Sequence, residues 1–312
     1  MTEYVAIPAL ALTLVALWWE RRRATQALAA RLGLRFEPGG LRDVLVGERD
    51  GVGVRVVLGQ EARIEAGGAP TGVRVVGRGV AQRYGMGEVA RGMTGDPGFD
   101  QIVQVDGDPE RVSAALDAET RRNLRHLVGG FGATVFDGRV EVSSRREDLR
   151  ERLDVVVQVA GALAAGAIAE RLRANARDDP SPGVRRRCLR LLADAGDLDA
   201  ARAARADPDM LVRLQAKVLL GEPLGDVTVA LLATIAPEDP ERVFAAVAGD
   251  AELLRALASH PSPAVRSAAR SRVGDAGGRL TTSAEEGGTV AIAAEAGAVC
   301  AVPGTGDRKV AT

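Results

Sequence analysis

One short pattern occurs three times in the second half of the chain: a proline, a valine four residues later, and an arginine directly after the valine. The copies begin at Pro180, Pro208 and Pro261. A residue that precedes proline avoids the α-helical region, and proline is tolerated at the first helical position, so each copy predicts that one helix ends and another begins. The valine and the apolar residues three or four positions later then share one helix face. Short helices cannot bury such a face alone, so the pattern predicts a stack of helical hairpins.

This repeated turn resembles that of short bacterial HEAT repeats over about residues 163–276. The resemblance implies about three to four repeats and, because HEAT arrays usually serve as protein-binding scaffolds, a protein partner. Each arginine after a valine can reach a carbonyl or the aspartate of the adjacent turn. These candidate repeat-turn or interaction residues are Arg185, Arg213 and Arg266. An ordinary helical bundle is the alternative interpretation of the same pattern.

The first 23 residues predict a transmembrane helix. Tyr4 to Trp19 contains no charged residue, and at 1.5 Å per residue it is about 24 Å long, near the bilayer core of about 30 Å. The residues suited to the membrane interface follow at its end: Trp18, Trp19, Arg21, Arg22 and Arg23. The basic flank predicts a single-pass protein of the inner (cytoplasmic) membrane, with its N-terminus outside and the bulk of the chain in the cytoplasm. A cleaved signal peptide and a buried helix are the alternatives.

The middle of the chain has the pattern of a small α+β domain. Segments such as GVGVRVVLG alternate apolar with small or polar residues, as strands do, and Asp137-Gly138 predicts a two-residue hairpin turn. Over about residues 30–165 the sequence resembles a domain found behind N-terminal anchors in bacterial membrane proteins. The shared features are Gly95-Asp96-Pro97, Phe99-Asp100 and Leu116-Asp117. No activity comes with this resemblance.

The expected fold class is therefore α+β, with an N-terminal transmembrane helix, a small α+β domain and an α-helical HEAT-like solenoid. The domain boundaries follow the changes in pattern. They are a membrane anchor over 1–23, the α+β domain over 24–160, the helical repeats over 161–276, and a Gly-rich tail over 277–312 that we expect to be disordered.

No set of residues predicts catalysis, a cofactor or a metal ion. Four aspartates fall close together, at 96, 100, 106 and 108, but an apolar strand interrupts the alternation that a calcium loop needs, so we expect helix caps and turns. The glycine-rich segment from Gly85 lacks the Lys-Ser/Thr ending of a phosphate-binding loop. Cys188 fits an apolar helix stripe and Cys300 lies in the tail, so neither predicts a disulfide framework.

We therefore expect a membrane-anchored, cytoplasm-facing scaffold or adaptor that binds proteins and is not an enzyme. It contacts lipid through residues 4–19, and we expect neither a cofactor nor a small-molecule ligand. The alternative is a membrane-tethered HEAT protein that binds nucleic acid through Arg185–Arg187 and residues 266–272. A balance of 41 basic against 42 acidic residues and an aromatic content of 3% oppose that alternative.

Overall fold

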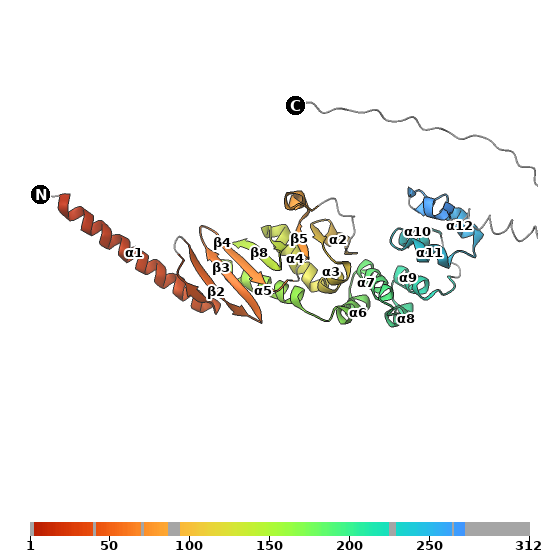
Figure 1. Cartoon of the computed structure of the whole chain (residues 1–312), viewed down its shortest axis with the longest axis horizontal. Helices are drawn as coiled ribbons and strands as arrows, with labels where there is room; N and C mark the ends of the chain where they lie inside the picture. The colour runs from red at the N-terminus through yellow and green to blue at the C-terminus, as the bar shows by residue number, and fades with distance from the viewer. Residues whose placement is uncertain are drawn as a thin grey trace, which may run out of the picture.

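The computed structural model describes residues 3–39, 42–69, 72–86, 94–224, 229–263 and 265–271; the side chains of 3–12 and 14 are not described. Its fold is α+β, as the sequence predicts, with one antiparallel sheet followed by a run of helices (Figure 1). The Gly-rich tail over 277–312, with Cys300, and most of the glycine-rich segment after Gly85 lie outside the described residues.

The predicted transmembrane helix is wrong. Helix α1 (Glu3–Leu32) includes the whole predicted span, but no single helix in the described part of the chain combines the length and hydropathy that crossing a membrane requires. Among the described helices, one bent pair, α5 (Leu149–Ala164) with α6 (Ile168–Asp178), meets the criterion jointly, with 111° between its halves. The inner-membrane location and the lipid contact of residues 4–19 depended on the predicted span.

In the described residues eight strands form the sheet, in the order β1-β2-β3-β4-β8-β7-β5-β6, and all neighbours are antiparallel. The strands are β1 (Arg35–Glu37), β2 (Asp43–Arg49), β3 (Val52–Leu58), β4 (Ala62–Gly67), β5 (Arg74–Gly77), β6 (Val103–Asp106), β7 (Thr134–Phe136) and β8 (Arg139–Ser144). Asp137 and Gly138 both have positive φ, at 48° and 77°, and they form the predicted turn between β7 and β8.

Strand alternation buries one face of the sheet. On β3 and β4 every second residue is buried, including Val54, Val56 and Ile64. Helix α5 packs on β3, β4 and β8, and α4 (Ala118–Phe131) packs on β5, β6 and β8. The end of α1 closes the same core through Ala29 and Leu32.

Three short elements accompany the far strands: the 3-10 helix η1 (Arg78–Tyr84) and α2 (Pro97–Asp100) come between β5 and β6, and α3 (Pro109–Ala115) comes between β6 and α4. The predicted aspartate caps are present. Asp96 accepts hydrogen bonds from the backbone amides of Gly98 and Phe99, and Asp108 caps α3 in the same way.

After α5 the chain forms successive helical hairpins (Figure 1). The helices are α6, α7 (Pro182–Asp194), α8 (Asp199–Ala203) with η2 (Ala204–Ala206), α9 (Met210–Leu220), α10 (Val229–Ile235), α11 (Pro240–Ala246) and α12 (Ala251–Leu257); residues 263 and 265–271 are also helical. Helix α6 packs against α7, and α7 packs against α9. We call this run the helical array.

The array is joined to the α+β part by α3. This helix packs against both α6 and α7, and its Ala114 belongs to the same apolar cluster as Leu172, Val184 and Leu189. The first hairpin of the array is therefore covered on its free side by a helix of the preceding part of the chain.

The repeated proline does not start the following helix at the three matching turns, as the sequence predicts it should. Helix α7 begins at Pro182 and α9 at Met210, each two residues after the repeated proline. Instead, the side chain of the residue before each proline bonds the backbone two residues later, and this turn places two residues before the first residue of the helix. By contrast Pro240, which also follows an aspartate but precedes its valine by only three residues, takes the first helical position of α11.

Candidate functional site

The three repeated turns share one side-chain hydrogen bond. The side chain of the residue before proline accepts the backbone N–H of the residue two positions later, which fixes the chain reversal. The pairs are Asp179–Ser181, Asp207–Asp209 and His260–Ser262, at 2.9, 2.8 and 3.1 Å. Nδ1 of His260 is the acceptor in the third turn, so histidine replaces aspartate there without loss of the bond.

The arginine after each valine bonds the backbone of its own turn. In each case Nη1 donates to the carbonyl oxygen six residues earlier. The pairs are Arg185–Asp179, Arg213–Asp207 and Arg266–His260, at 2.6, 2.6 and 2.7 Å. The structure therefore does not bring the three candidate interaction arginines together: each lies in its own turn and holds that turn through Nη1.

Arg185 also connects its turn to the next one. Its Nε and Nη2 donate to the two carboxylate oxygens of Asp207, each at 2.9 Å. The two side chains are only 9% and 7% exposed. This is a bidentate ion pair largely removed from water, so the loss of either partner would leave the other charge buried and unpaired.

Arg121, on α4, repeats this arrangement one step earlier. Its Nη1 and Nη2 donate to the two oxygens of Asp179 at 2.8 and 2.9 Å, and Nη1 also donates to the carbonyl of Leu116, at 2.7 Å. The side chains of Arg121 and Asp179 are 3% and 1% exposed. An arginine of α4 thus binds the aspartate of the first turn in the same way that an arginine of α7 binds the aspartate of the second turn.

A second carboxylate completes this junction. Nε of Arg121 donates to Asp96 at 2.9 Å. Burial alone would raise the pKa of Asp96, but hydrogen bonds from Arg121 and from the backbone amides of Phe99 and Gly98 outweigh it, so the pKa lies below its ordinary value. Burial likewise disfavours the charged form of Arg121, while Asp179 and Asp96 bring its pKa above the ordinary value. We call Arg121, Asp96 and Asp179 the junction.

Sequence reasoning found Asp179 as part of the repeated turn and Asp96 as a cap, but it missed Arg121. Arg121 is one of two adjacent arginines in an amphipathic helix, and its partner lies 58 residues further along the chain. The only local signal is its distance from Leu116, whose carbonyl it bonds five residues back. Arg213 and Arg266 make the same five-residue bond to the carbonyls of Pro208 and Pro261.

Two glycines allow the two parts of the chain to touch at this junction. A Cβ atom on Gly183, in the first turn of α7, would overlap the backbone carbonyl of Gly95. Gly95 has φ of +86°, and its carbonyl also accepts a hydrogen bond from the Ser181 hydroxyl at 2.9 Å. Backbone here meets backbone, so neither side can yield by turning a side chain.

We therefore expect Gly183→Ala to lower the free energy of unfolding by about 1–3 kcal/mol, because the added methyl forces α7 away from the segment before α2. Urea unfolding monitored by circular dichroism measures the change. Gly130→Ala, in α4, is the control: its Cβ would meet open space, so helix propensity alone should act there and stabilise slightly. Equal effects of the two substitutions would contradict the close contact.

The aspartate cluster and Cys188, both considered from the sequence, have structural roles. Asp100 accepts a hydrogen bond from the Thr94 hydroxyl at 2.8 Å, and Asp106 pairs with Arg74 at 3.9 Å. Among the residues that the structure describes, no group of three or more His, Cys, Asp or Glu could hold a metal ion. Cys188 is fully buried, and this burial raises the pKa of its thiol to about 12, as expected for a core residue.

The residues assigned to the membrane interface lie on α1. Trp18 and Trp19 are each 53% exposed and meet edge to face at 6.4 Å. Arg22 and Arg23 stack over their rings, at 4.9 and 5.4 Å, and Arg21 pairs with Asp43 of β2 at 3.4 Å. These contacts tie the second half of α1 to itself and to the first sheet hairpin.

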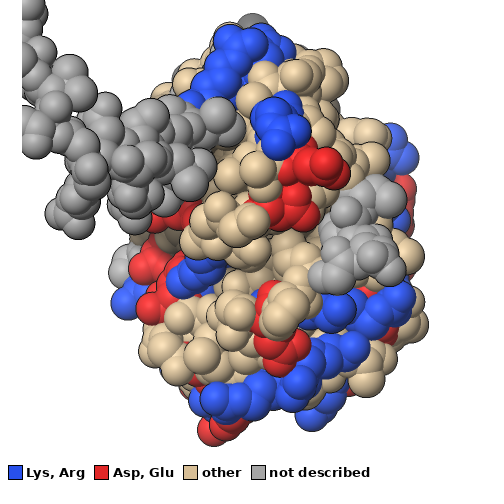
Figure 2. All heavy atoms as spheres, turned by 90° about the vertical axis from the view of Figure 1, so that its right-hand side faces the viewer, with Lys and Arg blue, Asp and Glu red and all other residues tan. Residues whose placement is uncertain are grey.

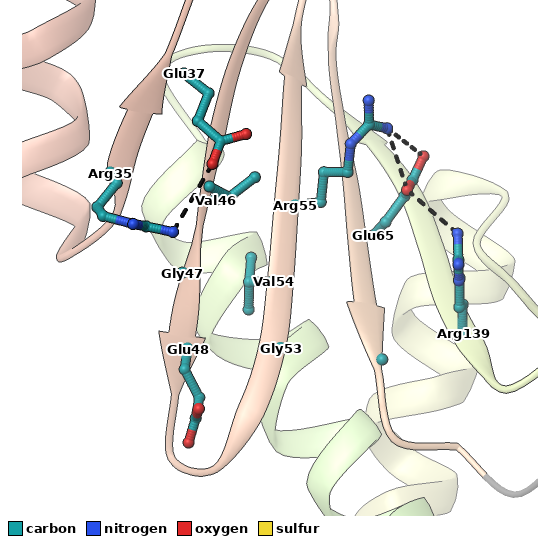
Figure 3. A pocket seen from close by; sticks show the side chains of 11 residues that line it. Arg35, Glu37, Val46, Gly47, Glu48, Gly53, Val54, Arg55, Glu65 and Arg139 are labelled. Carbon is teal, nitrogen blue, oxygen red and sulfur yellow. Dashed lines mark hydrogen bonds and ion pairs between the residues drawn. The ribbon is translucent and has the colours of Figure 1, made fainter.

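A hollow of about 680 Å³ lies on the solvent-facing side of the sheet (Figure 3). Its charges pair across the strands: Arg55 lies 3.4 Å from Glu65, and Arg139 lies 3.9 Å from the same carboxylate. The lining residues are Arg35, Glu37, Val46, Gly47, Glu48, Gly53, Val54, Arg55, Glu65, Gly67 and Arg139. Because its arginines already face carboxylates, the hollow is a neutralised sheet surface, and the junction is the better candidate for an organising site.

Comparison with known proteins adds little. No protein-family model matches the chain, and no curated relative matches it. Among solved structures, the crystal structure of the mycobacterial trehalose monomycolate transport factor A is similar at 16% identity, over 45% of this chain and 93% of that one, with a TM-score of 0.31. A TM-score this low does not define a shared fold.

Proposed function

We propose that this protein is a protein-binding scaffold without a reaction of its own, whose HEAT-like helical array presents a surface fixed to the α+β part. The observation that carries the proposal is the pair of buried bidentate ion pairs, Arg121–Asp179 and Arg185–Asp207. Each holds one layer of the stack against the next. A surface that is already ordered before binding loses less conformational entropy when a partner docks, which is what a scaffold requires.

The covering of the first hairpin supports the same proposal. Terminal repeats of an array need a cap, because their outer face has no neighbouring repeat to bury it. Helix α3 packs on α6 and α7, and Arg121 of α4 supplies the ion pair that a preceding repeat would supply. The α+β part then serves as the N-terminal cap of the array.

Photo-crosslinking in cells tests this function. A photoreactive amino acid replaces Met210, which is 53% exposed at the start of α9, and in a matched control it replaces Arg63 on the sheet hairpin surface. We expect the full-length chain to form discrete adducts with protein from position 210 and few from position 63. Adducts that disappear after nuclease treatment, or that form equally from both positions, would contradict a protein-binding array.

A further inference from the structure

Three arginines of α7 form a cluster on one side of the helical array. Arg186 and Arg190 are four residues apart and Arg187 lies between them, so all three project from adjoining faces of the helix. The side chains of Arg186 and Arg190 reach towards the turn before α11: Nη2 of Arg186 donates to Glu238 at 3.2 Å, and Nη1 of Arg190 donates to the same carboxylate at 2.7 Å. We call Arg186, Arg187 and Arg190 the arginine cluster.

The cluster carries more positive charge than its neighbours compensate. Glu238 is shared by two of the arginines, and Nε of Arg187 donates to the neutral hydroxyl of Ser113, at 2.9 Å. Burial, and then repulsion from Arg190, lower the pKa of Arg187, as expected when two guanidinium groups face each other.

Arg186 has donors to spare. Its side chain is 10% exposed, yet Nε and Nη1 are buried and have no hydrogen-bond partner among the residues that the structure describes. Its sequence neighbour Arg185 shows the contrast, since Nε and Nη2 of that residue bind Asp207 and Nη1 binds a carbonyl. A buried guanidinium with unused donors is costly, and a bound ion is one of the explanations for such a group in a native protein.

We propose that the arginine cluster binds the side-chain carboxylates of an acidic segment on the partner protein. This inference rests on the proposed scaffold function and names the chemistry of its partner. A carboxylate matches the planar fork of a guanidinium, and Glu238 already bridges two of the three arginines in this way.

Duplex nucleic acid fits the cluster less well. Within the arginine run at 185–187, Arg185 is already paired with Asp207, so only Arg186 and Arg187 could bind a phosphate. On the end of the molecule that faces the viewer in Figure 2, acidic side chains lie among the basic ones at the centre, and basic side chains gather along the lower edge. A duplex needs a row of phosphate contacts, whereas a short acidic peptide needs only a few converging donors.

Fluorescence anisotropy with the full-length chain and a fluorescein-labelled octaglutamate peptide tests the inference at 0.15 M salt. We expect Arg186→Gln and Arg190→Gln each to weaken binding about tenfold or more, because each removes one partner of a desolvated charge pair. Glu238→Gln should tighten binding, because it removes the carboxylate that competes for the same donors. The controls are Arg205→Gln and Glu222→Gln, which break an ion pair elsewhere in the array and should change binding less than twofold.

The other arms decide what is bound. Inorganic phosphate at millimolar concentration should displace the peptide no better than acetate does; stronger displacement by phosphate would overturn the assignment to carboxylates. Random duplex DNA that binds with the same dependence on Arg186 would also overturn it. So would octaglutamate binding that none of the arginine-cluster variants changes, or no binding at all.

Thermal unfolding keeps the variants interpretable. Arg186→Gln should leave the melting temperature unchanged or raise it, because it removes unpaired buried donors. If octaglutamate fails to bind while protein adducts at position 210 persist, the inference fails and the scaffold proposal stands. If the adducts are absent but Arg186-dependent peptide binding is found, the anion site stands and the scaffold proposal fails.

Discussion

Replacing Arg121 with methionine should lower the free energy of unfolding by about 3–5 kcal/mol, because it leaves the Asp179 carboxylate buried and unpaired. Asp96 loses its arginine as well, so the hydrogen bond and charge that depress its pKa disappear. In the wild type, the depressed pKa of Asp96 stabilises the folded state at any pH above the ordinary pKa of a carboxyl group. This stabilisation is lost as the pH falls through the pKa of Asp96 in the folded protein. The variant should therefore lose less stability on acidification. Urea unfolding at a series of pH values measures both effects.

Arg122→Met is the matched control for this prediction. Arg122 is the next residue of α4 and is exposed, so its loss should change stability by less than about 0.5 kcal/mol. A double variant, Arg121→Met with Asp179→Leu, should recover part of the loss because no charge is left buried alone. If Arg121→Met costs no more than Arg122→Met, the junction does not hold the two parts of the chain together.

Arg185→Met should also lower the free energy of unfolding by about 3–5 kcal/mol, because it leaves the buried Asp207 carboxylate without its ion-pair partner. Arg213→Met should cost only about 1–2 kcal/mol, because Arg213 donates to two neutral carbonyls and no ion pair in the described structure depends on it. The two arginines occupy equivalent positions of the repeated turn, so the difference isolates the contribution of the ion pair.

Chemical denaturation of the two variants side by side measures this difference. Asp207→Asn is the second test, because it keeps a side-chain oxygen to accept the Asp209 amide while removing the charge that Arg185 binds. It should reproduce most of the loss seen with Arg185→Met. Equal costs for Arg185→Met and Arg213→Met would show that the turn alone, and not the pair to the next turn, determines stability.

The repeated turn shows how far local sequence patterns reach. Pro180, Val184 and Arg185 are close in sequence, and their spacing predicted a helix boundary and an arginine turned back onto carbonyls or a neighbouring aspartate. The helix start was misplaced by two residues, because the Asp179 side chain builds a turn that the proline rule does not include. Alternating valines similarly predicted strands but not their order, in which β4 pairs with β8 across a long connection.

The junction could not be predicted from patterns of this kind. Arg121 and Asp179 are 58 residues apart in the sequence, and the packing of the elements around α3, α6 and α7 brings them together. The only local signal at Arg121, its five-residue distance from Leu116, does not identify the distant carboxylate. The prediction for the N-terminal helix was wrong for a different reason. The uncharged run of residues 4–19 was interpreted as a membrane span. In the structure the same helix continues through the arginines to Leu32, and its end packs on the sheet.

The central claim is that the α+β part and the helical array form one unit held by Arg121 and Asp179. The distance between spin labels at positions 61 and 205, both exposed, tests it most directly, with Cys188 and Cys300 replaced. We expect one narrow distance distribution in the parent chain and a clearly broadened one in Arg121→Met under conditions where both remain folded. A distribution that is already broad in the parent chain, or equally narrow in the two, would contradict the claim.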